Sequence, residues 1–197
     1  TLSLPVQFGN IAKAYIAQDN QLSVDTNKRI ANPNALNLYV LGYNLNKNLE
    51  TLPLAAKENL ATYIEQYRML TDAINIKDAS VLNFNVEFDI SVKKGFNNEQ
   101  VLITCINNLK TFFNIDNWQI NQPLIAGDIS SLLYNVDGVQ NVGKIQFNNL
   151  FGVARGYSKF KYNFEAATRN NIIYPPVDPA IFELKNPNSD IIGRISN

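Results

Sequence analysis

One stretch decides the fold of this chain: residues 82–92, which read LNFNVEFDISV. Apolar and polar residues alternate along it without exception, and this period of two is typical of a β-strand with one buried and one solvated face. Strands that are buried on both faces read instead as continuous apolar runs. The pattern therefore predicts a long strand in an antiparallel or mixed sheet, which ends at Lys93-Lys94-Gly95.

Upstream of this strand, the sequence predicts strands within 4–16, at 35–43 and through 74–76, where apolar residues alternate with polar ones. Between the last two, apolar residues recur every three or four positions over 53–71, which favours an amphipathic helix. Thr51 is expected to cap this helix, because threonine often precedes a first turn that contains proline.

Downstream, two more helical patterns are followed by a returning strand. Asn98 is expected to cap a helix that runs to Phe113, and a further helix is expected at 125–136. Gly138 would end that helix by adopting a left-handed conformation, and 139–147 would return as a strand. The order β-β-α-β followed by β-α-α-β predicts an α+β fold of two small subdomains, each a mostly antiparallel or mixed sheet covered by helices.

The character of the sequence changes after Leu150. Aromatic residues alternate with lysines over 157–164, which predicts an aromatic strand, and four of the eight prolines lie at or after Pro175. Proline disrupts regular elements, yet the apolar side chains between these prolines would be costly to leave in water. We therefore expect an extended proline-rich C-terminal arm on another surface. The expected domains are 1–78, 79–150 and 151–197.

Composition narrows the classes of function. Lysine and arginine number 17, as do aspartate and glutamate, so the zero net charge argues against nucleic acid and anionic membranes as partners. Thirty asparagines give a polar but uncharged surface, which suits a protein that packs against other proteins. No apolar run approaches a membrane span, and no signal-peptide pattern opens the chain. The start at Thr1, with Met69 as the single methionine, indicates a piece of a longer protein.

Candidate catalytic groups are few. The sequence contains no histidine, which excludes histidine-dependent triads and ordinary zinc sites, and Cys105 is expected to be a buried structural thiol. Glu87 and Asp89 share one strand face about 7 Å apart and could bind a cation or flank a glycosidic bond. A solvated strand face explains them better, so we expect no enzyme activity, no cofactor and no metal.

An RNA-binding strand is the alternative reading of the aromatic segment. Arg155-Gly156-Tyr157 and Tyr162 match the opening and the final aromatic of the RNA-recognition signature. Lys159 stands where the central stacking aromatic belongs, however. The alternative function is therefore a single-stranded nucleic-acid-binding module that uses 155–164.

The order of elements over 60–147 also resembles a known family. The residues that carry the resemblance are PLIAGDISSL at 123–132, VDGVQNV at 136–142, the opening LPVQFGNIAKAY at 4–15 and YPPVDP at 174–179. With the long strand, they resemble the J-like baseplate proteins of contractile-tailed bacteriophages. Within that family they are most similar to the C-terminal region of the large baseplate wedge subunit of the T-even type.

The resemblance implies a structural subunit of the virion tail baseplate that is assembled in the host cytoplasm. Such subunits dimerise, link wedges into a ring around the hub and contact other wedge proteins and the base of the sheath. It also implies an N-terminal helical region that is missing here. Aromatic side chains dominate interface centres, so we expect the contacts to come from the aromatic segment and the arm. The expected interface residues are Tyr157, Phe160, Tyr162, Tyr174, Pro175, Pro176, Ile181 and Phe182.

Overall fold

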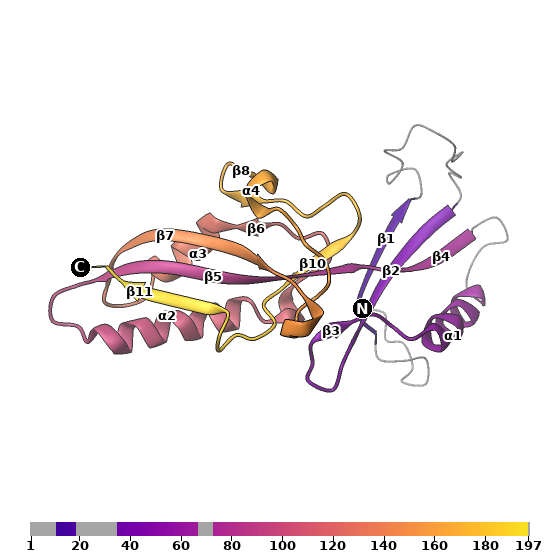
Figure 1. Ribbon diagram of the computed structural model, residues 1–197, viewed down its shortest axis with the longest axis horizontal. Coiled ribbons are helices and arrows are strands. Elements are labelled where there is room, and N and C mark those ends of the chain that lie inside the picture. The colour runs from indigo at the N-terminus through magenta and orange to yellow at the C-terminus, as the bar shows by residue number, and fades with distance from the viewer. Residues whose placement is uncertain (1–10, 19–34, 67–72, 197) are drawn as a thin grey trace. The chain divides into compact units, whose positions relative to one another are not determined.

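The computed structural model describes residues 11–18, 35–66 and 73–196. The chain divides into two compact units: Thr1–Ser80 with Val177–Ala180, and Val81–Pro176 with Ile181–Asn197. In the described residues the helices and the mixed or antiparallel sheets confirm the α+β class (Figure 1). The residues after Leu150 are divided between the two units.

Unit 1 is a mixed sheet built around one central strand. Strand β2 (Ala35–Tyr43) pairs with antiparallel β1 (Ile11–Gln18) along one edge. Its other edge is shared by antiparallel β3 (Leu49–Glu50) and parallel β4 (Ala73–Asp78). The connection between β2 and β4 contains helix α1 (Leu54–Glu65). The apolar face of α1 packs on the sheet in a core of Leu38, Val40, Leu52 and Leu60, with Ile64, Ile74 and Ile76 beside it.

The ends and faces of unit 1 differ in detail from the sequence expectations. The N-cap of α1 is Pro53 rather than Thr51, and the Pro53 carbonyl accepts hydrogen bonds from the backbone N–H groups of Ala56 and Lys57. In β1, Lys13 and Ala17 are buried while Ile16 is exposed, so the apolar pattern does not identify the inner face. The expected continuation of α1 through 67–71 and the start of the first strand before Ile11 lie outside the described residues.

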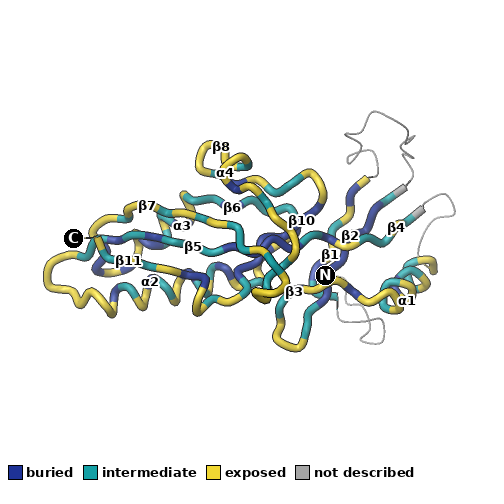
Figure 2. The backbone as a smooth tube through the Cα atoms, in the orientation of Figure 1, coloured by how far each residue is buried: buried dark blue, intermediate teal, exposed yellow. Residues whose placement is uncertain are grey.

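Unit 2 is organised by β5 (Ser80–Val92), the strand that the alternating pattern predicts. Along one edge β5 pairs antiparallel with β7 (Val139–Leu150), and a bulge at 143–144 lies opposite Asp89. Its other edge pairs with β10 (Ala180–Glu183) and with parallel β11 (Ile191–Ile195). The expected mixed sheet is therefore confirmed. Figure 2 shows that buried residues lie along both β5 and β10.

Two helices cover the apolar face of this sheet, which carries Phe84, Val86, Phe88 and Ile90. Helix α2 (Asn98–Phe112) buries Val101, Cys105 and Leu109, and α3 (Ala126–Tyr134) buries Ile129 and Leu133. The short helix α4 (Phe164–Ala167) and a small sheet complete the unit. That sheet pairs β9 (Ile172–Ile173) with β6 (Leu124–Ile125) and β8 (Thr168–Arg169).

Three expectations for unit 2 need correction. The N-cap of α2 is Asn97, one residue before the predicted Asn98, and its side chain accepts hydrogen bonds from two backbone N–H groups of the first turn. Residues 157–163 form no strand. Residues 174–179 are irregular as expected, but the chain beyond them forms β10 and β11 in this unit's own sheet. These two strands pair with the edge of β5, and most of their apolar side chains are thereby buried within the chain itself.

The turn between α3 and β7 tests the expectation for Gly138. This glycine has φ +94°, and an added Cβ would lie 2.6 Å from the Phe96 ring and 2.8 Å from Val101. We expect Gly138→Ala to lower the free energy of unfolding by about 1–3 kcal/mol, because it adds backbone strain and overpacking. In α3, Gly127→Ala meets only one atom, at 3.9 Å, and should stabilise the helix slightly. Urea denaturation measures the free energy of unfolding of both variants. Equal changes in the two would contradict the strained, closely packed conformation assigned to Gly138.

Candidate interaction surface

The connection from β7 to α4 forms a closed surface loop, residues 151–161, called here the 151–161 loop. The backbone N–H of Gly152 donates to the Ser158 carbonyl at 2.8 Å, and that of Tyr157 donates to the Gly152 carbonyl at 3.2 Å. The 3-10 turn Val153–Arg155 lies between two glycines in positive-φ conformations, Gly152 at +115° and Gly156 at +79°. The loop therefore has its own internal hydrogen bonds and uses glycines where the backbone requires them.

Asparagine side chains fasten this loop to the sheet. The Oδ1 atom of Asn83 in β5 accepts a hydrogen bond from the Ser158 backbone N–H at 2.7 Å. The Oδ1 atom of Asn149 in β7 accepts one from the Tyr162 backbone N–H at 2.8 Å, and its Nδ2 donates to the Asn83 carbonyl at 2.9 Å. These hydrogen bonds give partners to backbone N–H groups of the loop that would otherwise have none.

Two buried carboxylates accept hydrogen bonds from residues that hold the 151–161 loop on the sheet. The Nδ2 atom of Asn83 donates to the Glu183 carboxylate at 2.8 Å, and both residues are buried. The Tyr157 hydroxyl donates to the buried Asp190 carboxylate at 2.7 Å. Burial raises the pKa of Tyr157, and the bond to Asp190 raises it further, so the phenol stays protonated and keeps donating.

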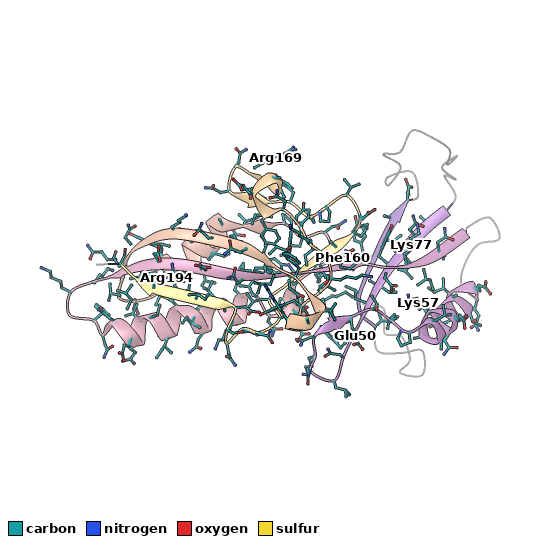
Figure 3. The ribbon with its side chains drawn as sticks, in the orientation of Figure 1. Glu50, Lys57, Lys77, Phe160, Arg169 and Arg194 are labelled. Atoms are coloured by element: carbon teal, nitrogen blue, oxygen red, sulfur yellow. The ribbon has the colours of Figure 1, made fainter. Side chains whose placement is uncertain are left out.

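The outer side of the loop is apolar and cationic. Phe151, Val153 and Phe160 are 41%, 74% and 37% exposed (Phe160 is labelled in Figure 3). The ammonium of Lys159 lies 5.3 Å from the centroid of the Phe160 ring, and that of Lys161 lies 5.5 Å from the centroid of the Phe151 ring. Arg155 is exposed as well, and residues 151–161 contain no acidic residue.

The structure distributes the predicted interface residues between this surface and the core. Phe160 is on the loop, and Tyr157 and Tyr162 are half-buried anchors; the Tyr162 hydroxyl donates to the Tyr174 carbonyl at 2.8 Å. Tyr174 is exposed, whereas Pro175 and Pro176 are half-buried. Ile181 and Phe182 are 0% and 1% exposed and belong to the core of unit 2. The interface role of this set stays a prediction, but replacing the last two would disturb folding first.

Sequence reasoning missed Phe151 and Val153. They lie one and three residues after Leu150, the last residue assigned to the second domain, and neither belongs to the aromatic–lysine alternation. The one available signal is the pair of glycines on either side of Val153–Arg155, Gly152 and Gly156, which are typical of a tight loop.

One of the two candidate carboxylates, Glu87, has partners within the sheet. Glu87 accepts from Arg194 of β11 at 3.2 Å (Arg194 is labelled in Figure 3) and from the Asn148 amide at 3.2 Å, so its charge is used within the sheet. The described residues hold no cluster of three or more His, Cys, Asp or Glu side chains that could bind a metal. The RNA-recognition reading of 155–162 required a strand, and that segment contains none. Helices long and apolar enough to cross a membrane are likewise missing from the described ranges.

Cys105 is fully buried in α2, as the sequence predicts. Burial raises the pKa of its thiol to about 11, and a backbone hydrogen bond lowers it only in part. The thiol is therefore protonated near neutral pH and is a poor nucleophile.

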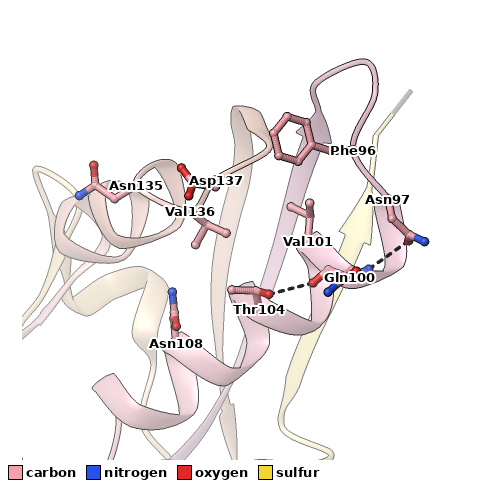
Figure 4. A pocket seen from close by; sticks show the side chains of 9 residues that line it. All are labelled: Phe96, Asn97, Gln100, Val101, Thr104, Asn108, Asn135, Val136 and Asp137. Atoms are coloured by element: carbon pink, nitrogen blue, oxygen red, sulfur yellow. Dashed lines mark hydrogen bonds between the residues drawn. The ribbon is translucent and has the colours of Figure 1, made fainter.

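An open groove of about 410 Å³ lies between α2 and the turn after α3 (Figure 4). Two of its polar side chains serve α2 itself: Asn97 caps the helix, and the Thr104 hydroxyl donates to the Gln100 carbonyl at 2.9 Å. The side chains of Gln100, Asn108, Asn135 and Asp137 are further polar groups on its wall. Its lining residues are Phe96, Asn97, Gln100, Val101, Thr104, Asn108, Asn135, Val136 and Asp137.

No protein-family model and no curated protein sequence matches the chain. Its fold is similar to that of a chain in the cryo-EM structure of the anti-feeding prophage (AFP) baseplate, 6-fold symmetrised, with a TM-score of 0.51 and 12% sequence identity. The similarity covers 88% of this chain but 34% of that one, so this chain spans about a third of the length of its structural neighbour. The fold of this chain therefore resembles that of a baseplate protein.

Proposed function

We propose that this chain is a structural subunit of a phage or phage-like tail baseplate that associates with itself and docks to other wedge proteins in the ring around the hub. The observation that carries the proposal is the similarity to a baseplate chain along 88% of the sequence. The 151–161 loop supports it, because a fixed apolar surface suits protein contacts. Such a subunit would act mechanically rather than catalytically, by holding neighbouring subunits in place.

The test is association with baseplates in the cell that encodes the chain. The full-length protein carries an affinity tag, and tail-like particles are purified on a density gradient. We expect the tagged protein to sediment with the particles in a fixed ratio to the other baseplate proteins, and image reconstruction should place it in the wedge. Complete particles that lack the protein would contradict the proposal.

A further inference from the structure

We propose that the 151–161 loop inserts as a preformed unit into an apolar depression rimmed by carboxylates on another protein of the assembly. This inference rests on the proposed function and names the chemistry of the partner surface.

The apolar part of the argument comes from exposure. Phe151, Val153 and Phe160 lie within ten residues of chain, and each keeps more than a third of its surface in solvent although unit 2 has a large aromatic core. Removing this area from water is favourable only if another surface covers it. Val153, on the 3-10 turn of the closed loop, is the most exposed of the three at 74%, so a depression that surrounds it would remove the most apolar area from water.

The charged part decides what surrounds that depression. The chain as a whole is neutral, yet the loop carries Arg155, Lys159 and Lys161 with no acidic residue among them. The two lysines stand beside the aromatic rings at 5.3 and 5.5 Å, so any surface that covers the rings also desolvates the ammonium groups. Cations desolvated without counter-charges oppose binding. The partner should therefore place aspartate or glutamate around an apolar centre.

The rigidity of the loop favours a protein partner over nucleic acid. Base stacking needs an open aromatic face, and here an ammonium group lies over a face of each ring. Internal hydrogen bonds and the Asn83 and Asn149 anchors fix the backbone before binding. A preformed loop loses little conformational entropy on docking, and this benefit is largest against a partner of fixed shape.

The first experiment compares two triple variants with the wild type in the particle assay. The loop variant is Val153→Ser with Lys159→Glu and Lys161→Glu. The matched control, Ile103→Ser with Lys93→Glu and Lys94→Glu, changes one β-branched aliphatic residue and two lysines in the same way at other exposed positions of unit 2. We expect the loop variant to associate about 100-fold more weakly and the control to remain close to wild type. Circular dichroism and thermal unfolding establish that both are folded.

The second experiment identifies the partner surface. A photoreactive benzoylphenylalanine at position 153 is cross-linked in assembled particles, and the linked peptide is sequenced. We expect an apolar site flanked by aspartate or glutamate, and replacing those acids by lysine should restore association of the Lys159→Glu, Lys161→Glu protein.

Several results would overturn this inference. The first is that the folded loop variant associates with particles as strongly as the wild type. The second is that the cross-linked surface contains no carboxylates. The third is that the loop makes the chain bind oligothymidine or phosphatidylglycerol vesicles instead of particles. If the wild-type chain and the loop variant both associate normally with particles, this inference alone is refuted. A wild-type chain that never joins particles would refute the proposed function as well.

Discussion

We expect Phe84→Ala to lower the free energy of unfolding of unit 2 by about 3–5 kcal/mol, the loss typical of a large aromatic side chain removed from a core. Phe84 is fully buried, and its ring lies 5.3–6.5 Å from the rings of four other phenylalanines. Its partners come from the end of α2, from β7, from α4 and from β10: Phe113, Phe147, Phe164 and Phe182. One ring therefore joins elements that are distant in the sequence.

Urea denaturation followed by tryptophan fluorescence measures this loss. The single tryptophan, Trp118, is buried 5.6 Å from the Phe113 ring, so its emission reports on the same core. Phe160→Ala is the control, because that ring lies on the surface loop, and we expect it to cost less than about 1 kcal/mol. Similar losses for the two variants would mean that the Phe84 cluster is not the centre of the core.

The buried face of β5 was predictable because apolar and polar residues alternate over eleven consecutive residues, 82–92. The same alternation predicts a solvated face, but Asn83 on that face is buried under the 151–161 loop. The loop covering Asn83 is more than sixty residues away along the chain, and a local pattern carries no information about such a contact.

The C-terminal segment shows the same limit for pairing. Ile181 and Phe182 follow a proline-rich stretch and have no periodic neighbours, so the sequence favoured an arm that lies on another surface. Their partner is the free edge of β5, about a hundred residues upstream. The apolar character of the segment correctly required burial, but the sequence could not tell burial within the chain from burial against a partner.

The candidate surface was predicted only in part for a related reason. Alternation of aromatics with lysines over 157–164 favours a strand, whereas backbone N–H groups that donate to the side chains of Asn83 and Asn149 hold this backbone in an irregular path. Asparagine side chains compete with regular backbone pairing in this way. Composition alone predicts that the many asparagines form a neutral surface, but some of them anchor the loop and thereby decide which aromatic residues face solvent.

Asn83→Ala should lower the free energy of unfolding by about 3 kcal/mol and loosen the loop at the same time. The change removes a partner from the Ser158 backbone N–H, at 2.7 Å, and from the buried Glu183 carboxylate, at 2.8 Å. Removing one partner of a buried hydrogen bond costs more than a net hydrogen bond contributes, and more still when the group that loses it is charged. Urea denaturation measures the stability, and limited trypsin digestion measures cleavage after Arg155, Lys159 and Lys161 in the loop.

Asn85→Ala separates the anchor from a general effect of losing an asparagine. Asn85 lies two residues along the same strand face and accepts from the Asn148 backbone N–H at 3.1 Å, in a half-exposed position that water can reach. We expect a loss below about 1 kcal/mol and unchanged trypsin cleavage of the loop. Faster cleavage in Asn83→Ala alone would show that the strand holds the loop in its docking conformation. Equal cleavage in both variants would mean that the internal hydrogen bonds of the loop suffice, because Gly152 and Ser158 would then close it without the sheet.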